Sequence, residues 1–280
     1  GAALRFDGDG GGVTASIPTT GSTSANPGAA AFTLVAWVRP DVVKGARQTF
    51  IGQQLSGSDS TTKLTGFSLG VDDGFLSAAV RVACPAASCD CEQHREARHW
   101  RAAIHAGRWS HVAASYDGSQ WKLYVDGTLK ATVPFSGGAA FGGSSESVAP
   151  ILVGSEGVVE GVSGSPSEVR SFRGLIASAS VWSVALSDAD VAAVMSCPPA
   201  ADAANLLAHV ELDEGVGSGG VVNSAGNKYG PALAVALDAD AHPAANVWSS
   251  VTCGAYKTSA ARVEVTGTGT TQGIAGNCAV

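Results

Sequence analysis

"WKLYVDGTLKAT" (residues 121–132) decides the fold class, because this stretch contains a complete β-hairpin signal. Trp121, Leu123 and Val125 fall on one face of a strand and the residues between them on the other, since strand side chains alternate with a period of two. The Asp-Gly pair at 126–127 then supplies a two-residue turn, whose central positions need positive φ values that glycine adopts without steric cost. The stretch therefore predicts two neighbouring antiparallel strands.

Short alternating runs separated by turn residues recur along the rest of the chain. Many short strands joined by Gly-rich turns, with almost no helical periodicity, predict an all-β, two-sheet antiparallel jelly-roll sandwich. The expected strands besides the hairpin are FTLVAWV (32–38), GFSLGV (66–71), FLSAAVRV (75–82), WSHVAASY (109–116), ILVG (151–154), GLIASASVW (174–182) and LLAHVEL (206–212).

One short helix is predicted between the last two of these strands, in "ALSDADVAAVM". Ser187 is a good N-cap, and Asp190 three residues later completes a capping box. Val191, Val194 and Met195 form an apolar stripe. We expect the helix to end before the Cys-Pro-Pro sequence at 197–199, because proline cannot continue a helix.

Composition excludes several classes of function. Hydrophobic residues make up 45% of the 280 residues and charged residues only 15%, and the 36 glycines suit a turn-rich β protein. A formal net charge of −7 without any Lys/Arg-rich run argues against a nucleic-acid partner. No apolar run approaches the roughly 20 residues of a membrane span, so no membrane insertion is expected. The chain opens on "GAALRF", without an initiator Met or a signal peptide, which indicates a mature chain or a fragment.

Six cysteines in an acidic, Gly/Ser/Thr-rich chain favour an oxidising compartment, and hence an extracellular or cell-surface protein. We predict a disulfide between Cys197 and Cys253, because these residues flank the closing segment of the domain. The bridge would tie that segment to the sandwich.

Several stretches together carry a family resemblance. The chain resembles laminin-G-like domains of the concanavalin A-like jelly-roll superfamily over roughly residues 2 to 253. The resemblance implies that Trp121, Leu123 and Val125 face the other sheet across the core. The stretches that carry it, in the order seen in the family, are ALRFDGDGGGV, FTLVAWVRPD, GFSLGVDDG, WSHVAASYDGSQWKLYVDGTLKAT, FRGLIASASVWSVALSDADVAAVM and LLAHVELDEGVGSGGVVNSAGN.

Two stretches depart from the family pattern. Residues 256–280 lie beyond it and are similar to the opening strand of filamin-type immunoglobulin-like repeats. We therefore divide the chain into a jelly roll at 1–255 and a C-terminal arm, or truncated β domain, at 256–280. The other stretch, residues 83–106, is a Cys-rich insert where the family usually has a short polar turn.

The insert could hold either a disulfide or a metal. We expect a surface loop pinned by a bridge from Cys84 to Cys89 or Cys91, with "EQHREARHW" forming a short charged helix. The alternative is Zn²⁺, because the ligand types would suit that ion although their spacing matches no zinc module. The residues concerned are Cys84, Cys89, Cys91, His94 and His99.

The superfamily contains glycoside hydrolases, whose paired carboxylates project from one face of a strand. In "ELDEG", Glu211 and Glu214 would face opposite sides of a strand. Asp213 could share a face with Glu211, but it reads better as part of the strand's exit turn. We therefore expect no enzymatic activity.

Calcium is a more plausible ligand, since it prefers carboxylate and carbonyl oxygens in acidic loops. The resemblance implies one Ca²⁺ at a loop rim, held by Asp7 and Asp9, with Asp213 joining them if the first and last strands are neighbours. The alternative is that these Asp-Gly pairs are only turn formers.

Aromatic residues outside the alternating runs could stack on sugar rings. Trp100, Trp248 and Tyr229 lie in irregular stretches and are the candidates for exposed, ligand-binding aromatics. His111 and His209 sit in predicted strands and are expected to be core or edge histidines with satisfied hydrogen bonds rather than ligands.

The resemblance implies a non-enzymatic recognition module of a larger secreted or cell-surface protein, binding a glycan or an extracellular protein in adhesion or matrix assembly. The alternatives are a structural module that docks on neighbouring domains of an extracellular or ciliary-surface assembly, and a glycoside hydrolase.

Overall fold

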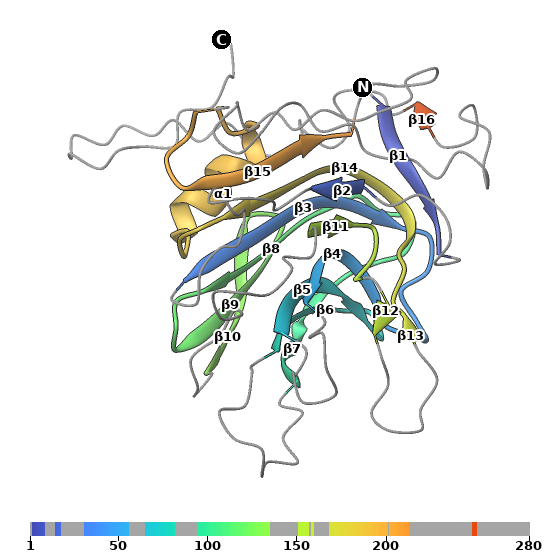
Figure 1. The fold of residues 1–280 in the computed structure, drawn as a ribbon, viewed down its shortest axis with the longest axis horizontal. Coiled ribbons are helices and arrows are strands. Elements are labelled where there is room, and N and C mark those ends of the chain that lie inside the picture. Colours follow the sequence, from blue (N-terminus) through green and yellow to red (C-terminus); the bar gives the residue numbers. More distant parts are fainter. Residues whose placement is uncertain are drawn as a thin grey trace.

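Two antiparallel sheets packed face to face form the protein, as predicted (Figure 1). The fold was analysed in a computed structural model. It describes residues 2–8, 15–17, 31–55, 65–81, 94–134, 151–156, 158–159, 168–200, 202–212 and 248–250. None of these residues forms a helix with the length and hydropathy needed to cross a bilayer.

The larger sheet has eight strands, in the order β10-β9-β8-β3-β14-β1-β16, with β15 also paired to β14. Its strands are β1 (Ala2–Asp7), β3 (Phe32–Pro40), β8 (Ser110–Tyr116), β9 (Gln120–Val125), β10 (Thr128–Pro134), β14 (Arg173–Trp182), β15 (Leu206–Glu211) and β16 (Trp248–Ser250).

Strand β14 organises this sheet because it pairs with three others. β3 runs along one of its edges, whereas β1 and β15 share the other edge end to end. Asp7 lies opposite Arg173, and Glu211 lies opposite Ser178. β16 then adds to β1, so residues 248–250 belong to the same sheet as the start of the chain.

The smaller sheet has six strands in the order β2-β11-β4-β5-β6-β7. They are β2 (Ala15–Ile17), β4 (Gln48–Leu55), β5 (Thr65–Asp72), β6 (Phe75–Arg81), β7 (His94–Ala103) and β11 (Ile151–Val153). A separate two-strand ribbon pairs β12 (Val158–Val159) with β13 (Glu168–Val169).

The predicted hairpin is β9 and β10, and its details are confirmed. Asp126 and Gly127 have φ values of 52° and 68°, as a tight turn between twisted strands requires. Trp121, Leu123 and Val125 belong to the main hydrophobic cluster, which both sheets line. The bulky face of the hairpin therefore fills the space between the sheets.

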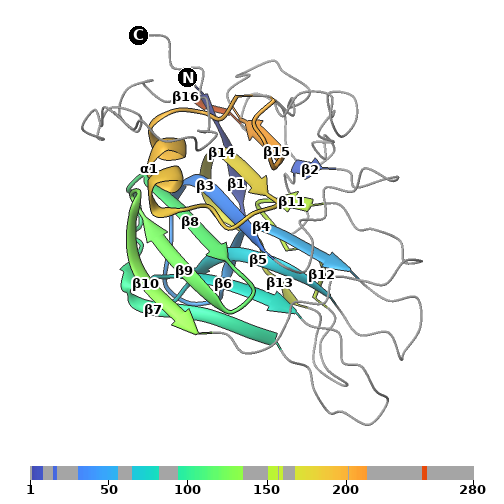
Figure 2. The same ribbon diagram turned by 90° about the vertical axis from the view of Figure 1, so that its left-hand side faces the viewer.

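Helix α1 (Asp188–Ser196) begins and ends where the sequence predicts. Ser187 and Asp190 form the reciprocal capping box, and Cys197 is the C-cap. Val191 and Val194 are buried against the outer face of the large sheet, in a second cluster with Tyr124 and Trp182. Figure 2 shows the helix lying over β3 and β8, so this part of the sheet is covered on both faces.

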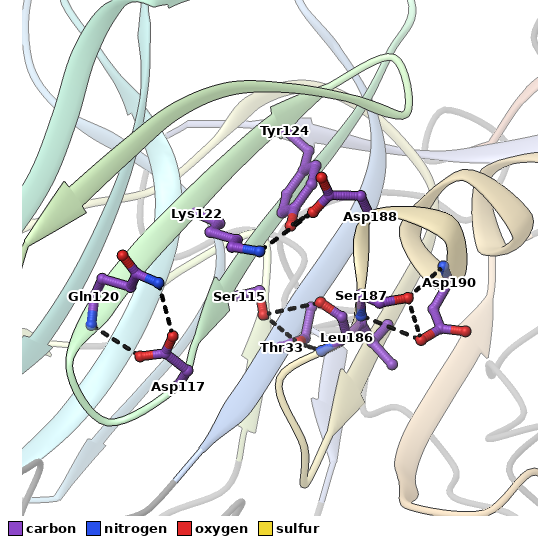
Figure 3. Close-up of polar contacts among 10 residues, drawn as sticks. All are labelled: Thr33, Ser115, Asp117, Gln120, Lys122, Tyr124, Leu186, Ser187, Asp188 and Asp190. Atoms are coloured by element: carbon purple, nitrogen blue, oxygen red, sulfur yellow. Dashed lines mark hydrogen bonds and ion pairs between the residues drawn. The ribbon is translucent and has the colours of Figure 1, made fainter. Parts of the chain in front are cut away.

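Polar contacts fix the segment that leads into α1 (Figure 3). Thr33 Oγ1 on β3 accepts a hydrogen bond from the backbone N–H of Leu186 at 2.9 Å and lies 2.8 Å from the Val184 carbonyl oxygen. The Tyr124 hydroxyl donates to Asp188 Oδ1 at 2.8 Å. Burial and this carboxylate together hold the pKa of Tyr124 well above its usual value, so the hydroxyl stays a donor.

The helix predicted in "EQHREARHW" was wrong, because residues 94–103 form strand β7 at the edge of the six-stranded sheet. β7 pairs with β6, and Ala97, Ala102 and Ile104 reach the core. Pairing to an existing sheet and burial of these apolar side chains outweigh the weak helical preference of the charged residues.

Candidate functional site

Trp100 on β7 is the most exposed large hydrophobic side chain in the described part of the protein. Its exposed fraction is 66%, and the next is Val42 at 41%. In contrast, Trp121 and Trp182 are fully buried and Trp37 nearly so. The prediction that Trp100 is exposed is therefore confirmed.

A bulge in β7 places Trp100 at the surface. The register with β6 shifts between the pairs Ser77↔Arg98 and Phe75↔Ala103, which inserts extra residues into β7. Ala97 and Ala102 both face the core, although regular alternation would put them on opposite faces. The extra residues at 99–101 bulge outward, as strand bulges do when they redirect a side chain.

Two neighbours pack on the indole of Trp100. The guanidinium carbon of Arg101 lies 5.0 Å from the ring centroid, a cation–π contact. The His99 ring is stacked at 5.6 Å between centroids with an interplanar angle of 27°. His99 Nδ1 also accepts the backbone N–H of Arg101 at 3.2 Å, which holds the three residues in one arrangement. The indole is thus positioned by two neighbours, while most of the side chain remains exposed to solvent.

The sheet surface that adjoins Trp100 is polar. Ser68 and Ser77 lie between core residues along β5 and β6, so their side chains point away from the core, but both are fully buried and present no surface to a ligand. Arg47 Nη2 donates to Ser68 Oγ at 2.9 Å, and Arg98 Nη1 pairs with Asp72 Oδ2 at 2.9 Å. The polar groups that remain accessible near the exposed indole are those of the Arg98–Asp72 pair, and an aromatic ring with polar groups nearby can recognise a sugar.

A second feature is a small cavity on the outer face of the large sheet, at the C-terminal end of α1. Its volume is about 20 Å³, which is room for one water molecule and far too little for a sugar ring. Trp37, His111, Ser180, His209, Glu211 and Pro199 are among its lining residues.

His111 in this cavity is an unusual histidine. It is fully buried on β8 and packs edge-on against Trp37, and burial lowers its pKa to about 3. Neither ring nitrogen has a hydrogen-bond partner among the described residues. The ring is neutral at physiological pH, so it cannot serve as a proton donor in general acid catalysis there.

The hydrolase alternative depended on Glu211. This residue ends β15, and its Oε1 lies 3.4 Å from His209 Nε2. The other two carboxylates of that alternative, Asp213 and Glu214, lie outside the described residues. His209 is buried, as is His111, but both lie on the outer face beneath α1 and not between the sheets.

The calcium site remains a prediction. Asp7 ends β1 opposite Arg173, while Asp9 and Asp213 lie outside the described residues. Leu212, just before Asp213, donates to the Ala177 carbonyl, four positions along β14 from Arg173. At a rise of about 3.3 Å per residue, these points are roughly 13 Å apart, so the strand pairing gives no support for a ligand set that joins Asp7 to Asp213. Across the described part of the chain, no three His, Cys, Asp or Glu side chains come together as a metal site.

The remaining predicted site residues fall mostly outside the description. Cys197 is disulfide-bonded, and the other five cysteines all lie outside the described residues, so its pairing with Cys253 stays a prediction. The bridge from Cys84 to Cys89 or Cys91, and zinc as its alternative, stay predictions too. Trp248 lies in β16 without a described side chain, and Tyr229 is not described.

The comparison with protein families identifies the superfamily to which the chain belongs. The family model Laminin_G_3, described as concanavalin A-like lectin/glucanases superfamily, matches residues 8–192. The chain belongs to this superfamily. No curated protein matches the chain at a significant level.

Solved structures share the superfamily fold. A putative carbohydrate binding protein from Bacteroides ovatus is 18% identical, with a TM-score of 0.53 over 80% of this chain and 56% of that one. This chain thus spans little more than half of that protein. The CBM40 of the Ruminococcus gnavus IT-sialidase, bound to α2,3-sialyllactose, is 18% identical with a TM-score of 0.50, over 69% of this chain and 95% of that one. At these identities the similarity shows the fold alone.

Sequence reasoning found Trp100 but missed Arg101 and His99 as its partners. It assigned the segment to a helix, on which adjacent residues point in different directions and would not pack on one ring. The local pattern offered no clear strand signal, because the bulge interrupts the alternation of β7.

Proposed function

We propose that this superfamily member is a non-enzymatic carbohydrate-recognition module, and that the surface around Trp100 contacts the sugar. The observation that carries the proposal is the exposed indole, held by His99 and Arg101 on a rigid sheet edge. Indole faces stack on the apolar faces of sugar rings, and a fixed ring loses little conformational entropy on binding.

The fold supports this proposal without deciding it. The superfamily includes lectins, and one structurally similar protein is described as a carbohydrate binding protein. We further propose that the module works outside the cell, as part of a larger secreted or cell-surface protein in adhesion or matrix assembly. The cysteine content and the disulfide-bonded state of Cys197 support an oxidising environment.

The direct test is a glycan array followed by titration calorimetry with the best binder. We expect Trp100→Ala to weaken binding by at least about tenfold, the effect of losing roughly 1.4 kcal/mol of stacking. Its thermal unfolding should barely change, because an exposed side chain contributes little to stability.

Val42→Ala is the matched control, since Val42 is the other exposed large apolar side chain among the described residues and lies in the segment after β3, not on β7. It should bind like the parent protein. Equal binding by Trp100→Ala and the parent protein would show that the sugar does not bind at the Trp100 surface of β7. An array without any binder would favour the alternative of a structural docking module.

A further inference from the structure

The charge around Trp100 differs from that of the chain as a whole. The protein carries a net charge of −7, yet residues 94–108, "HREARHWRAAIHAGR", contain four arginines and three histidines against one glutamate. This basic segment comprises β7 and the turn after it. A locally positive edge on an acidic protein attracts anions rather than neutral ligands.

Most arginines of the segment with described side chains are already paired. Arg98 pairs with Asp72 at 2.9 Å, and Arg108 lies 3.5 Å from Asp126 Oδ2. The guanidinium of Arg101, in contrast, makes no ion pair with any described residue, and its one described contact is the face of Trp100. Its side chain is exposed, and no described acidic residue neutralises its charge.

We infer that the Trp100 surface recognises an acidic glycan, one that carries a carboxylate or a sulfate on the sugar that stacks on the indole. This inference rests on the proposed function and names its ligand class. A guanidinium presents its N–H groups in a planar fork that matches the two oxygens of a carboxylate or sulfate. Stacking on Trp100 keeps that fork beside the aromatic surface, so one ligand can use both groups.

Among the described residues, the carboxylate that pairs with β7 is already engaged. Asp72 is held by Arg98 at 2.9 Å. Held in that pair, its carboxylate leaves the Arg101 charge available. A bound anionic sugar would complete the charge balance of the edge.

The test is an array in which each acidic glycan is printed beside the neutral glycan of the same backbone. Suitable pairs are sialyllactose with lactose, oligogalacturonate with its methyl ester, and sulfated with desulfated galactan. We expect the acidic members to bind at least about tenfold more tightly than their neutral partners, and binding to weaken as NaCl is raised. The pairs separate a carboxylate ligand from a sulfate ligand.

Variants then assign the effect to Arg101. Arg101→Gln should remove the preference for the acidic member, and Arg101→Lys should restore only part of it, because an ammonium lacks the planar fork. Arg173→Gln is the matched control: it removes the same charge from the other sheet, at a side chain without an ion pair among the described residues. It should behave like the parent protein.

The results that would contradict the inference can be distinguished from those that would contradict the proposed function. Equal binding of neutral and acidic members, or an acidic preference that survives in Arg101→Gln, would overturn the inference and leave the proposed function in place. An array on which nothing binds, acidic or neutral, would overturn both.

Discussion

The pKa of the buried His111 imidazole differs strongly from that of a histidine in water. Burial lowers its pKa to about 3, whereas a histidine in the unfolded chain titrates near 6.5. Below pH 6.5 the His111 imidazole therefore binds a proton in the unfolded state but not in the folded state. Stability is fully present above that pH and is lost as the pH falls toward 3.

We predict that the free energy of unfolding falls by about 2 kcal/mol between pH 7 and pH 5 through this residue alone. Asp117 and Asp188, whose pKa values are lowered by hydrogen bonds from their neighbours, lose their contributions only at more acidic pH. Urea unfolding at each pH, in His111→Leu and in the exposed control His105→Leu, measures the effect. The dependence of the unfolding free energy on pH should disappear in His111→Leu only. A pH dependence that persists in both variants would show that another group causes it.

His111 is buried, as a core position requires, but the prediction that its hydrogen bonds are satisfied was wrong, since neither ring nitrogen has a partner among the described residues. Alternation in "WSHVAASY" predicts one buried and one exposed face, yet every residue of β8 is buried. The second face is covered because α1 packs on it through Val191 and Val194. Which strand a helix covers depends on its tertiary position, and the local pattern does not contain that information.

At the scale of elements, one buried hydroxyl, that of Thr33, fixes the segment that leads into helix α1. Thr33 Oγ1 accepts a hydrogen bond from the Leu186 N–H and lies within hydrogen-bond distance of Ser115 Oγ (Figure 3). It also lies 2.8 Å from the Val184 carbonyl oxygen. Both Thr33 and Leu186 are buried. Without the hydroxyl, a buried backbone N–H would lack its partner.

We predict that Thr33→Val destabilises the protein by about 1–3 kcal/mol, since the shape is conserved and the loss is the unsatisfied N–H. Thr132→Val provides the control, because Thr132 is exposed on β10. That variant should change the free energy of unfolding by less than about 0.5 kcal/mol. Chemical denaturation measures both, and equal effects at the two positions would mean that the Thr33 hydroxyl does not anchor the helix.

Elements were predicted well where local signals were complete and poorly where they were not. The capping box at Ser187 and the Asp126-Gly127 turn each fix their own geometry within a few residues, and both were confirmed. Strand β7 lacks clear alternation because its bulge interrupts the pattern, and strand β4, "QTFIGQQL", was not predicted. Pairing with distant neighbours determines such strands.

At the scale of the whole molecule, the sheet order joins segments that are far apart in the chain. β1 at the start pairs with β14 and with β16 near residue 250. β15 follows α1 in the chain and pairs with β14, so residues 206–211 also belong to the larger sheet. The two-sheet class could be predicted from the sequence, but the end-to-end sharing of β14 by β1 and β15 could not, because strand pairing between distant segments leaves no local signal.

This architecture gives the disulfide of Cys197 a specific role. Cys197 caps α1 on the outer face of the large sheet and is disulfide-bonded, and we propose Cys253, three residues beyond β16, as its partner. The bridge would connect the helix to the end of the strand that completes the sheet. By restricting the unfolded chain over a long loop, it should stabilise the protein by about 4 kcal/mol.

Three variants test the pairing through their non-additivity. If Cys197 and Cys253 share one bridge, Cys197→Ser and Cys253→Ser should each lose about 4 kcal/mol of unfolding free energy, and the double variant should lose no more than either. Cys278→Ser, in the C-terminal arm, should leave the stability unchanged. Denaturation of the unreduced proteins gives the energies, and mass spectrometry of unreduced peptides identifies the bridge directly. Additive losses would disprove this pairing, because a single bridge can be lost only once. A peptide that joins Cys197 to any other cysteine would disprove it directly.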